Sequence, residues 1–180
     1  GEDLVWRWQG LEARWPAPQS PGLRGPHGRR NALAAIAAAM LAGSNADSVQ
    51  RGLDGFTGVR DRMEVVGTID GVTYINDTTA TAPVAAAAAL IALDRTRGKI
   101  HLLTGGADKK LDPKPLAVAA AESGAAVYLF NGTATAALIV ALAAQQVEPQ
   151  GTYDSMRDAV MAATSDARPG DCVLLSPGCA

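Results

Sequence analysis

The segment Asn76-Asp77-Thr78-Thr79-Ala80-Thr81 brings an amide, a carboxylate and three hydroxyls together within six residues. An apolar stretch precedes it and an alanine-rich stretch follows, so it lies where a strand would pass into a helix. One interpretation is helix capping, because Asp and Thr favour cap positions. The other is a ligand at the helix N-terminus, where Asp77 accepts hydrogen bonds from a ribose or helps to place Mg²⁺ and Thr81 donates to an anion. The residues by themselves leave both interpretations open.

A second candidate for chemistry is the pair Gly105-Gly106, which is followed by Lys109. Two glycines allow backbone N–H groups to approach an anion closely, and a lysine supplies a point charge. The competing interpretation is that the lysine is an ordinary solvated surface charge. The sequence has no G-x-G-x-x-G after a predicted strand and no G-x-x-x-x-G-K-[ST]. It therefore lacks a dinucleotide fingerprint and a complete phosphate-transferring loop.

The two histidines, His27 and His101, lie too far apart in the sequence to suggest a metal cluster, and no metal site is predicted. His101 is surrounded by apolar residues, so we expect it in the core or at a sheet edge. Cys172 and Cys179 have neither C-x-x-C nor zinc spacing, which is typical of reduced thiols rather than a disulfide framework. This cysteine usage predicts a cytoplasmic location.

From about Arg62 onward, short apolar strands alternate with longer helices. These elements must position the polar segments 76–81 and 105–109. The expected strands are 63–68, 72–75, 99–103, 126–130 and 172–175, and the expected helices are 82–93, 113–122, 133–144 and 154–167. The dipeptide Asp70-Gly71 joins the first two strands as a hairpin. The pattern predicts an α/β fold, a Rossmann-like, doubly wound, mostly parallel sheet with a hairpin at its N-terminal end. Ligands bind such sheets beyond the carboxyl ends of the strands, where both polar segments lie together with 131–133 and 176–180.

The first 60 residues have a different organisation. Residues 4–8 alternate large and charged side chains and predict a strand, while 15–25 carry three prolines and two glycines and predict a loop. Helices are expected from about Pro26 or His27 to Leu41 and over 47–53. The glycine-rich segment 52–60 is the expected boundary between two structural units.

Composition excludes several classes of protein. Sixteen Lys and Arg against eighteen Asp and Glu give a net charge of −2, so the basic excess of a typical nucleic-acid binder is missing. The most apolar stretches, 32–42 and 82–93, are too short to cross a bilayer, and no apolar signal segment opens the chain. Both ends break off at strand-like patterns, so we expect a piece of a longer protein.

Five segments in a fixed order resemble the motifs of the Mur ligases. Residues 25–27 leading into 31–35 are similar to their G-x-H-N-x-x-N-A-L-A-A segment, and 56–64 to their F-x-G-x-x-H-R-x-E hinge. Residues 74–81 resemble the I-N-D-S-K-A-T segment that opens their C-terminal domain. Residues 102–109 together with 175–180 resemble the D-glutamate-adding members of the family in particular.

The resemblance implies part of an enzyme. Residues 1–60 would be the C-terminal edge of a central ATP-binding domain, with its last strand and helices, and 61–180 most of the C-terminal, glutamate-binding domain. The implied activity is an ATP-dependent ligase of peptidoglycan synthesis that adds D-glutamate to UDP-N-acetylmuramoyl-L-alanine through an acyl phosphate. Its cofactors would be ATP and Mg²⁺, and its partners small-molecule substrates, with neither nucleic acid nor membrane insertion. In the family pattern the P-loop, the Mg²⁺ ligands and a modified lysine lie upstream of Gly1.

The resemblance also assigns residues by position. Asn31 would face the adenine, Arg62 the ATP phosphates and Asp77 the ribose, while Thr81 and Lys109 would hold D-glutamate. Further candidates on the same motifs are His27, Asn76, Thr79 and Ser176.

Three positions depart from the family pattern. Gly28 replaces an Asn, Asp61 replaces the hinge His, and Thr79 replaces a Lys. Two alternatives stay open: a stand-alone, non-catalytic binding module with the same fold, and another amino-acid-adding ligase resembling folylpolyglutamate synthase. The Gly105-Gly106 to Lys109 segment and 176–180 favour the D-glutamate member.

Overall fold

The computed structural model describes residues 3–16, 23, 25–93 and 98–180. The chain divides into two compact units, unit 1 (Gly1–Val59) and unit 2 (Arg60–Ala180). Each unit has its own hydrophobic core, and each is described by itself below.

Unit 1 contains a β-hairpin and two helices: β1 (Leu4–Trp8), β2 (Leu11–Trp15), α1 (Gly25–Leu41) and α2 (Ala46–Asp54). Gln9 and Gly10 make the turn, both with positive φ, which suits the tight connection of two antiparallel strands. The sequence pattern predicts β1 and both helices but misses β2. The reason is that β2 is mostly exposed, and its Glu12 forms ion pairs with arginines at positions 7 and 14 instead of packing into a core.

Unit 2 is built on a six-stranded sheet with the order β3-β4-β8-β5-β6-β7. Its strands are β3 (Glu64–Ile69), β4 (Val72–Asn76), β5 (Ile100–Gly105), β6 (Ala126–Phe130), β7 (Gly151–Tyr153) and β8 (Cys172–Leu175). The pair β3–β4 is antiparallel through the Asp70-Gly71 turn, and the other four pairings are parallel. The predicted mostly parallel α/β sheet with an initial hairpin is therefore confirmed.

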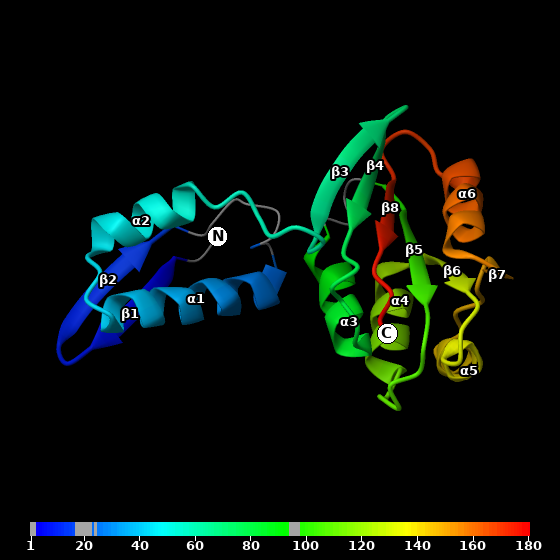
Figure 1. Cartoon of the computed structure of the whole chain (residues 1–180), viewed down its shortest axis with the longest axis horizontal. Coiled ribbons are helices and arrows are strands. Elements are labelled where there is room, and N and C mark those ends of the chain that lie inside the picture. The colour runs from blue at the N-terminus through cyan, green and yellow to red at the C-terminus, as the bar shows by residue number, and fades with distance from the viewer. Residues whose placement is uncertain (1–2, 17–22, 24, 94–97) are drawn as a thin grey trace. The chain divides into compact units, whose positions relative to one another are not determined.

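Four helices cover the sheet: α3 (Pro83–Ala92), α4 (Lys114–Ser123), α5 (Thr135–Ala144) and α6 (Met156–Asp166). The helices α3, α4 and α5 pack on one face in a core built largely from alanine and leucine, and α6 packs on the other face (Figure 1). Strands β5 and β6 are buried along their whole length because helices lie on both sides of them. The sequence pattern does not predict β7, since a strand of three residues is too short to show a periodicity.

No helix within the described ranges is long and apolar enough to cross a membrane.

Candidate functional site

The loops that follow β4, β8, β5 and β6 meet at one end of the sheet, because these strands run parallel and their carboxyl ends coincide. Hydrogen bonds tie the loops to each other. Thr104 Oγ1 donates to the Pro177 carbonyl over 2.6 Å, and Gly178 N–H donates to the Ala80 carbonyl over 2.8 Å. Ligands bind beyond the carboxyl ends of the strands in open α/β folds. We therefore take this end of the sheet as the candidate site.

Asp77, at the end of β4, is 4% exposed and bonded within the chain. Its Oδ2 accepts from the hydroxyl of Ser176 over 2.8 Å, and its Oδ1 accepts from the Met63 backbone N–H over 3.1 Å. Ser176 itself is fully buried. The carboxylate thus joins three segments. The helix-capping interpretation is wrong for α3, because its N-cap residue is Ala82 and no side chain caps this helix.

Three other candidate residues surround Asp77. Asn76 and Thr79 both bond to Asp61, with 2.9 Å from Asn76 Nδ2 to Asp61 Oδ1 and 2.9 Å from Thr79 Oγ1 to the Asp61 carbonyl. Arg62 is exposed and follows Asp61 directly. The structure therefore brings Arg62, Asn76, Asp77 and Thr79 together, as well as Ser176. Sequence reasoning recognised Asp61 as a departure from the family pattern but did not see it as the residue that links these groups.

The Gly105-Gly106 pair has a different role from the one predicted. Gly105 N–H donates to the Pro177 carbonyl over 3.1 Å, and Ala107 N–H donates to the Ala180 carbonyl over 2.9 Å. A Cβ on Gly105 would overlap the Phe130 carbonyl oxygen. The Gly105 amide bonds to a neighbouring loop, so the prediction that the glycine pair cradles an anion is wrong for Gly105. The Ala107 amide bonds to a neighbouring loop in the same way. The glycines instead allow close backbone packing of the loops at this end of the sheet.

Gly132 provides a test of this close packing. A Cβ there would overlap the Gly106 carbonyl oxygen, so we expect Gly132→Ala to lower the free energy of unfolding of unit 2 by about 3 kcal/mol. Gly67 in β3 is the matched control, because a Cβ there meets open space and Gly67→Ala should change stability by at most about 1 kcal/mol. Urea denaturation of both variants measures the difference. Equal stability of the two would contradict the packing argument.

Lys109 is exposed in the loop after β5. This loop is shaped by its own polar groups, since Asp108 N–H donates to Thr133 Oγ1 over 2.8 Å and Asp108 Oδ1 accepts from Lys110 N–H over 2.6 Å. Sequence reasoning placed Thr133 at a strand end but did not foresee that its hydroxyl holds the lysine loop. The ammonium group of Lys109 is thereby carried on a loop whose backbone is fixed from two sides.

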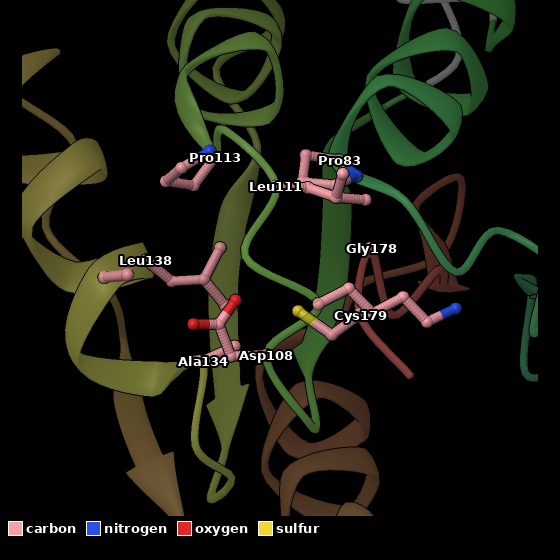
Figure 2. Close-up of a pocket in the computed structure, with 10 residues that line it drawn as sticks. Pro83, Asp108, Leu111, Pro113, Ala134, Leu138, Gly178 and Cys179 are labelled. Atoms are coloured by element: carbon pink, nitrogen blue, oxygen red, sulfur yellow. The ribbon is translucent and has the colours of Figure 1, made fainter.

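A small cavity lies beside Lys109, between the N-terminal ends of α3, α4 and α5 (Figure 2). It has a volume of about 20 Å³ and is lined mainly by apolar side chains, with Cys179 on one wall and Asp108 opposite. Burial and the nearby Asp108 raise the pKa of the Cys179 thiol, although Lys109 acts to lower it. A space of this size holds about one water molecule. A molecule the size of an amino acid therefore does not fit inside it.

The remaining candidate residues are Thr81 in unit 2 and two residues of unit 1. Thr81 is half-buried just before α3, and its backbone N–H donates to the Thr79 carbonyl over 3.0 Å. Asn31 is exposed and His27 is half-buried, both on α1 in unit 1. Gly28 lies on the same helix, and a Cβ there would overlap the backbone of Leu23, so this helix has no room for the Asn of the family pattern.

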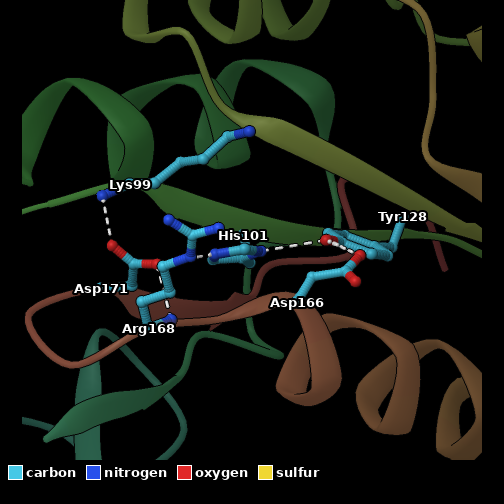
Figure 3. Close-up of polar contacts among 6 residues, drawn as sticks. All are labelled: Lys99, His101, Tyr128, Asp166, Arg168 and Asp171. Atoms are coloured by element: carbon cyan, nitrogen blue, oxygen red, sulfur yellow. Dashed lines mark hydrogen bonds and ion pairs between the residues drawn. The ribbon is translucent and has the colours of Figure 1, made fainter.

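A second polar group lies at the opposite, amino-terminal ends of the strands (Figure 3). His101 is 2% exposed, which confirms its expected place in the core, with Nδ1 3.0 Å from the Tyr128 hydroxyl and Nε2 3.2 Å from Asp171 Oδ2. The Tyr128 hydroxyl donates to Asp166 Oδ2 over 2.8 Å, and burial together with this bond raises the pKa of Tyr128. Burial acts to raise the pKa of Asp171 as well, but backbone N–H groups and His101 outweigh it and leave that pKa lowered.

This network connects β5, β6, α6 and the segment before β8, so it holds the sheet and α6 together. Lys99 and Arg168 are exposed beside it and line the same recess of about 450 Å³. Two exposed cationic side chains therefore line this recess. Among the described residues, no group of three or more His, Cys, Asp or Glu side chains could hold a metal ion, there or elsewhere.

Comparison with known proteins identifies the family. The family model for the Mur ligase glutamate ligase domain matches residues 61–179. The chain belongs to the Mur ligase family. It is 45% identical, over its whole length, to UDP-N-acetylmuramoylalanine--D-glutamate ligase of Roseiflexus sp. strain RS-1, and it covers 39% of that protein. The predicted resemblance to Mur ligases is confirmed.

Solved structures of low identity share the fold. The UDP-N-acetylmuramate-alanine ligase MurC of Thermotoga maritima has a TM-score of 0.69 at 18% identity, with 93% of this chain and 36% of that chain covered. A bifunctional folylpolyglutamate synthase/dihydrofolate synthase with Mn, AMPPNP and L-glutamate bound has a TM-score of 0.68 at 19% identity, with 97% and 41% covered. The chain spans about two fifths of the length of the curated Mur ligase relative that it matches.

Proposed function

We propose that this chain is part of an ATP-dependent ligase that joins D-glutamate to UDP-N-acetylmuramoyl-L-alanine in peptidoglycan synthesis. The observation that carries the proposal is the 45% identity to a D-glutamate ligase across the whole chain. In this proposal residues 1–60 form the edge of the ATP-binding domain and 61–180 the glutamate-binding domain. Both cysteines are free thiols, which supports a cytoplasmic location.

The reaction joins a carboxylate to an amine in two steps. The terminal carboxylate of the UDP-linked alanine attacks the γ-phosphorus of ATP, and ADP leaves. The amine of D-glutamate then attacks the carbonyl carbon of the acyl phosphate, so that a C–N bond forms, phosphate leaves and the amine nitrogen loses a proton. Catalysis of such steps depends on holding the reactants in place and on stabilising negative charge.

In this proposal Lys109 and Thr81 bind D-glutamate. Lys109 presents an exposed ammonium group on a fixed loop at the carboxyl ends of the strands, which suits a dianionic amino acid. Thr81 begins the turn into α3, where the positive end of the helix dipole favours a carboxylate.

Arg62 would contact the ATP phosphates, Asp77 the ribose and Asn31 the adenine. Asn76, Thr79 and Ser176 would act through the hydrogen bonds that they make to Asp61 and Asp77, and His27 is a further candidate on α1. A bound Mg²⁺ would neutralise charge on the ATP phosphates. Since the described part of the chain offers no set of three metal-binding side chains, the proposal assigns the Mg²⁺ ligands to other parts of the complete ligase.

The proposal predicts that this chain by itself has no turnover, because its sequence lacks a P-loop. The measurement is phosphate release with ATP, UDP-N-acetylmuramoyl-L-alanine and D-glutamate. We expect background release from the chain, and release that requires all three substrates from the complete ligase. Release above background from the chain would refute the prediction, and a complete protein that does not need D-glutamate would refute the proposed function.

A further inference from the structure

The segment that enters β3 has an unusual backbone on both sides of Arg62. Asp61 has a φ of +60° and Met63 a φ of +47°, and both are non-glycine residues in the left-handed region. Such conformations cost about 1–3 kcal/mol each and persist where the surrounding structure imposes them. What imposes them is visible in the hydrogen bonds of the two residues.

Asp61 is held through its main chain and its side chain. Its carbonyl accepts from Thr79 N–H over 3.1 Å and from Thr79 Oγ1 over 2.9 Å. Its Oδ1 accepts from Asn76 Nδ2 over 2.9 Å, and its N–H donates to Glu64 Oε2 over 2.8 Å. Asp61 also forms an ion pair with Arg60, whose Nε lies 3.7 Å from Asp61 Oδ2. This pair is exposed to solvent and therefore contributes little to stability.

Asn76 is itself oriented for this contact. Its Oδ1 accepts from Thr78 N–H over 3.1 Å, which leaves its amide nitrogen to face Asp61. On the other side of Arg62, Met63 N–H donates to Asp77 Oδ1 and the Met63 side chain, 6% exposed, packs in the core of unit 2. The residues before and after Arg62 are therefore both fixed to the loop that follows β4.

Arg62 differs from its two neighbours. It is exposed, and within the described residues its guanidinium makes no hydrogen bond or ion pair. A cation whose backbone is held on both sides, and whose charged end is left for solvent, is arranged to meet a ligand. Two departures from the family pattern, Asp61 and Thr79, contact each other in this arrangement, since the Thr79 hydroxyl donates to the Asp61 carbonyl.

We propose that Asp61, Asn76 and Thr79 are positioning residues, which hold the backbone around Arg62 and aim its guanidinium at the phosphates of ATP. The proposal rests on the proposed function, since it is ATP that supplies the phosphates. It goes beyond that function because it gives Asp61 and Thr79, which replace residues of the family pattern, a role in holding the backbone around Arg62.

The test is a double-mutant cycle in the complete ligase with Asp61→Ala and Arg62→Met. Asp61→Ala removes the acceptor for Asn76 and the tolerance of Asp for positive φ, so we expect kcat/KM for ATP to fall about tenfold or more. Arg62→Met should cause a loss at least as large. If Asp61 acts through Arg62, adding Asp61→Ala to Arg62→Met should cause no further loss, while its effect on the melting temperature should stay the same.

Asp61→Asn is the rescue variant, because Asn keeps the acceptor oxygen and tolerates the left-handed conformation. We expect Asp61→Asn to retain most of the kcat/KM for ATP that Asp61→Ala loses. If Asp61 had a purely structural role, Asp61→Ala would lower the melting temperature and leave kcat/KM for ATP unchanged. Alternatively, it would lower kcat/KM for ATP by the same factor in the unmodified enzyme and in Arg62→Met. Either result would overturn the proposal.

Failure of the proposed function has a different signature. An unmodified complete protein without ATP-dependent amide formation would refute the ligase proposal itself. An active protein in which Arg62→Met is harmful and Asp61→Ala is not would refute the positioning role alone. An active protein in which Arg62→Met changes nothing would refute the roles of both residues.

Discussion

Replacing Asp77 by alanine is expected to lower the free energy of unfolding of unit 2 by about 2–4 kcal/mol. The physical reason is that two buried donors, the Ser176 hydroxyl and the Met63 N–H, lose their acceptor at once. Each buried donor left without a partner costs about 1–3 kcal/mol. The carboxylate joins three segments of the chain. Its loss should therefore lower the urea concentration at the midpoint of unfolding.

Ser176→Ala is the matched control for this result. It removes one of the two bonds and leaves the Asp77 carboxylate bonded to Met63, so we expect roughly half of the loss. A change below about 1 kcal/mol in Asp77→Ala would contradict the structural role of the carboxylate.

The same Asp77→Ala variant also tests the ribose contact. In the complete ligase, loss of one charge-assisted hydrogen bond should raise the KM for ATP by about 10- to 150-fold, or roughly 1.5–3 kcal/mol. The KM for D-glutamate should change little. An unchanged KM for ATP, together with lower stability, would mean that Asp77 serves the fold alone.

Replacing Lys109 by methionine is expected to weaken the use of D-glutamate by roughly 1.5–3 kcal/mol, a rise in its KM of about 10- to 150-fold. Methionine keeps most of the stem and removes the charge that we propose to pair with the ligand carboxylate. Stability should be almost unchanged, because the side chain is exposed. Steady-state kinetics of the complete ligase, with D-glutamate varied, measures the effect.

Lys110→Met is the control for this prediction. Lys110 is also exposed and has a φ of +57°, and its contact to Asp108 is made by its backbone N–H, which the substitution keeps. We expect its KM for D-glutamate to stay close to that of the unmodified enzyme. Equal losses from both variants, or a loss from Lys110→Met alone, would place the glutamate site elsewhere.

The fold was predictable where the sequence pattern is strong. Residues 126–130 are a continuous apolar run, and 100–103 are apolar except for His101, because helices cover both faces of the sheet. Asp70-Gly71 has the positive φ angles that a tight hairpin needs. The misses have physical causes too. The strand 11–15 is mostly exposed, and 151–153 is too short to show any periodicity.

The placement of the candidate residues at one end of the sheet was predictable, but the contacts among them were not. Strand order places the segments after β4, β5 and β8 at one end, which any parallel sheet would do. Local sequence does not reveal that Asp61 bonds to Asn76 and Thr79, since these partners are 15 and 18 residues away. Nor does it separate a glycine that meets an anion from one that meets a neighbouring carbonyl, as Gly105 does.

The central claim is that D-glutamate binds at the carboxyl ends of the strands, beside Lys109. A crystal structure of the complete ligase with D-glutamate and a non-hydrolysable ATP analogue tests it most directly. The account predicts a glutamate carboxylate within about 3 Å of Lys109 Nζ, and an ATP phosphate oxygen within hydrogen-bond reach of the Arg62 guanidinium. Glutamate bound instead in the recess beside Lys99 and Arg168, at the amino-terminal ends of the strands, would contradict the account.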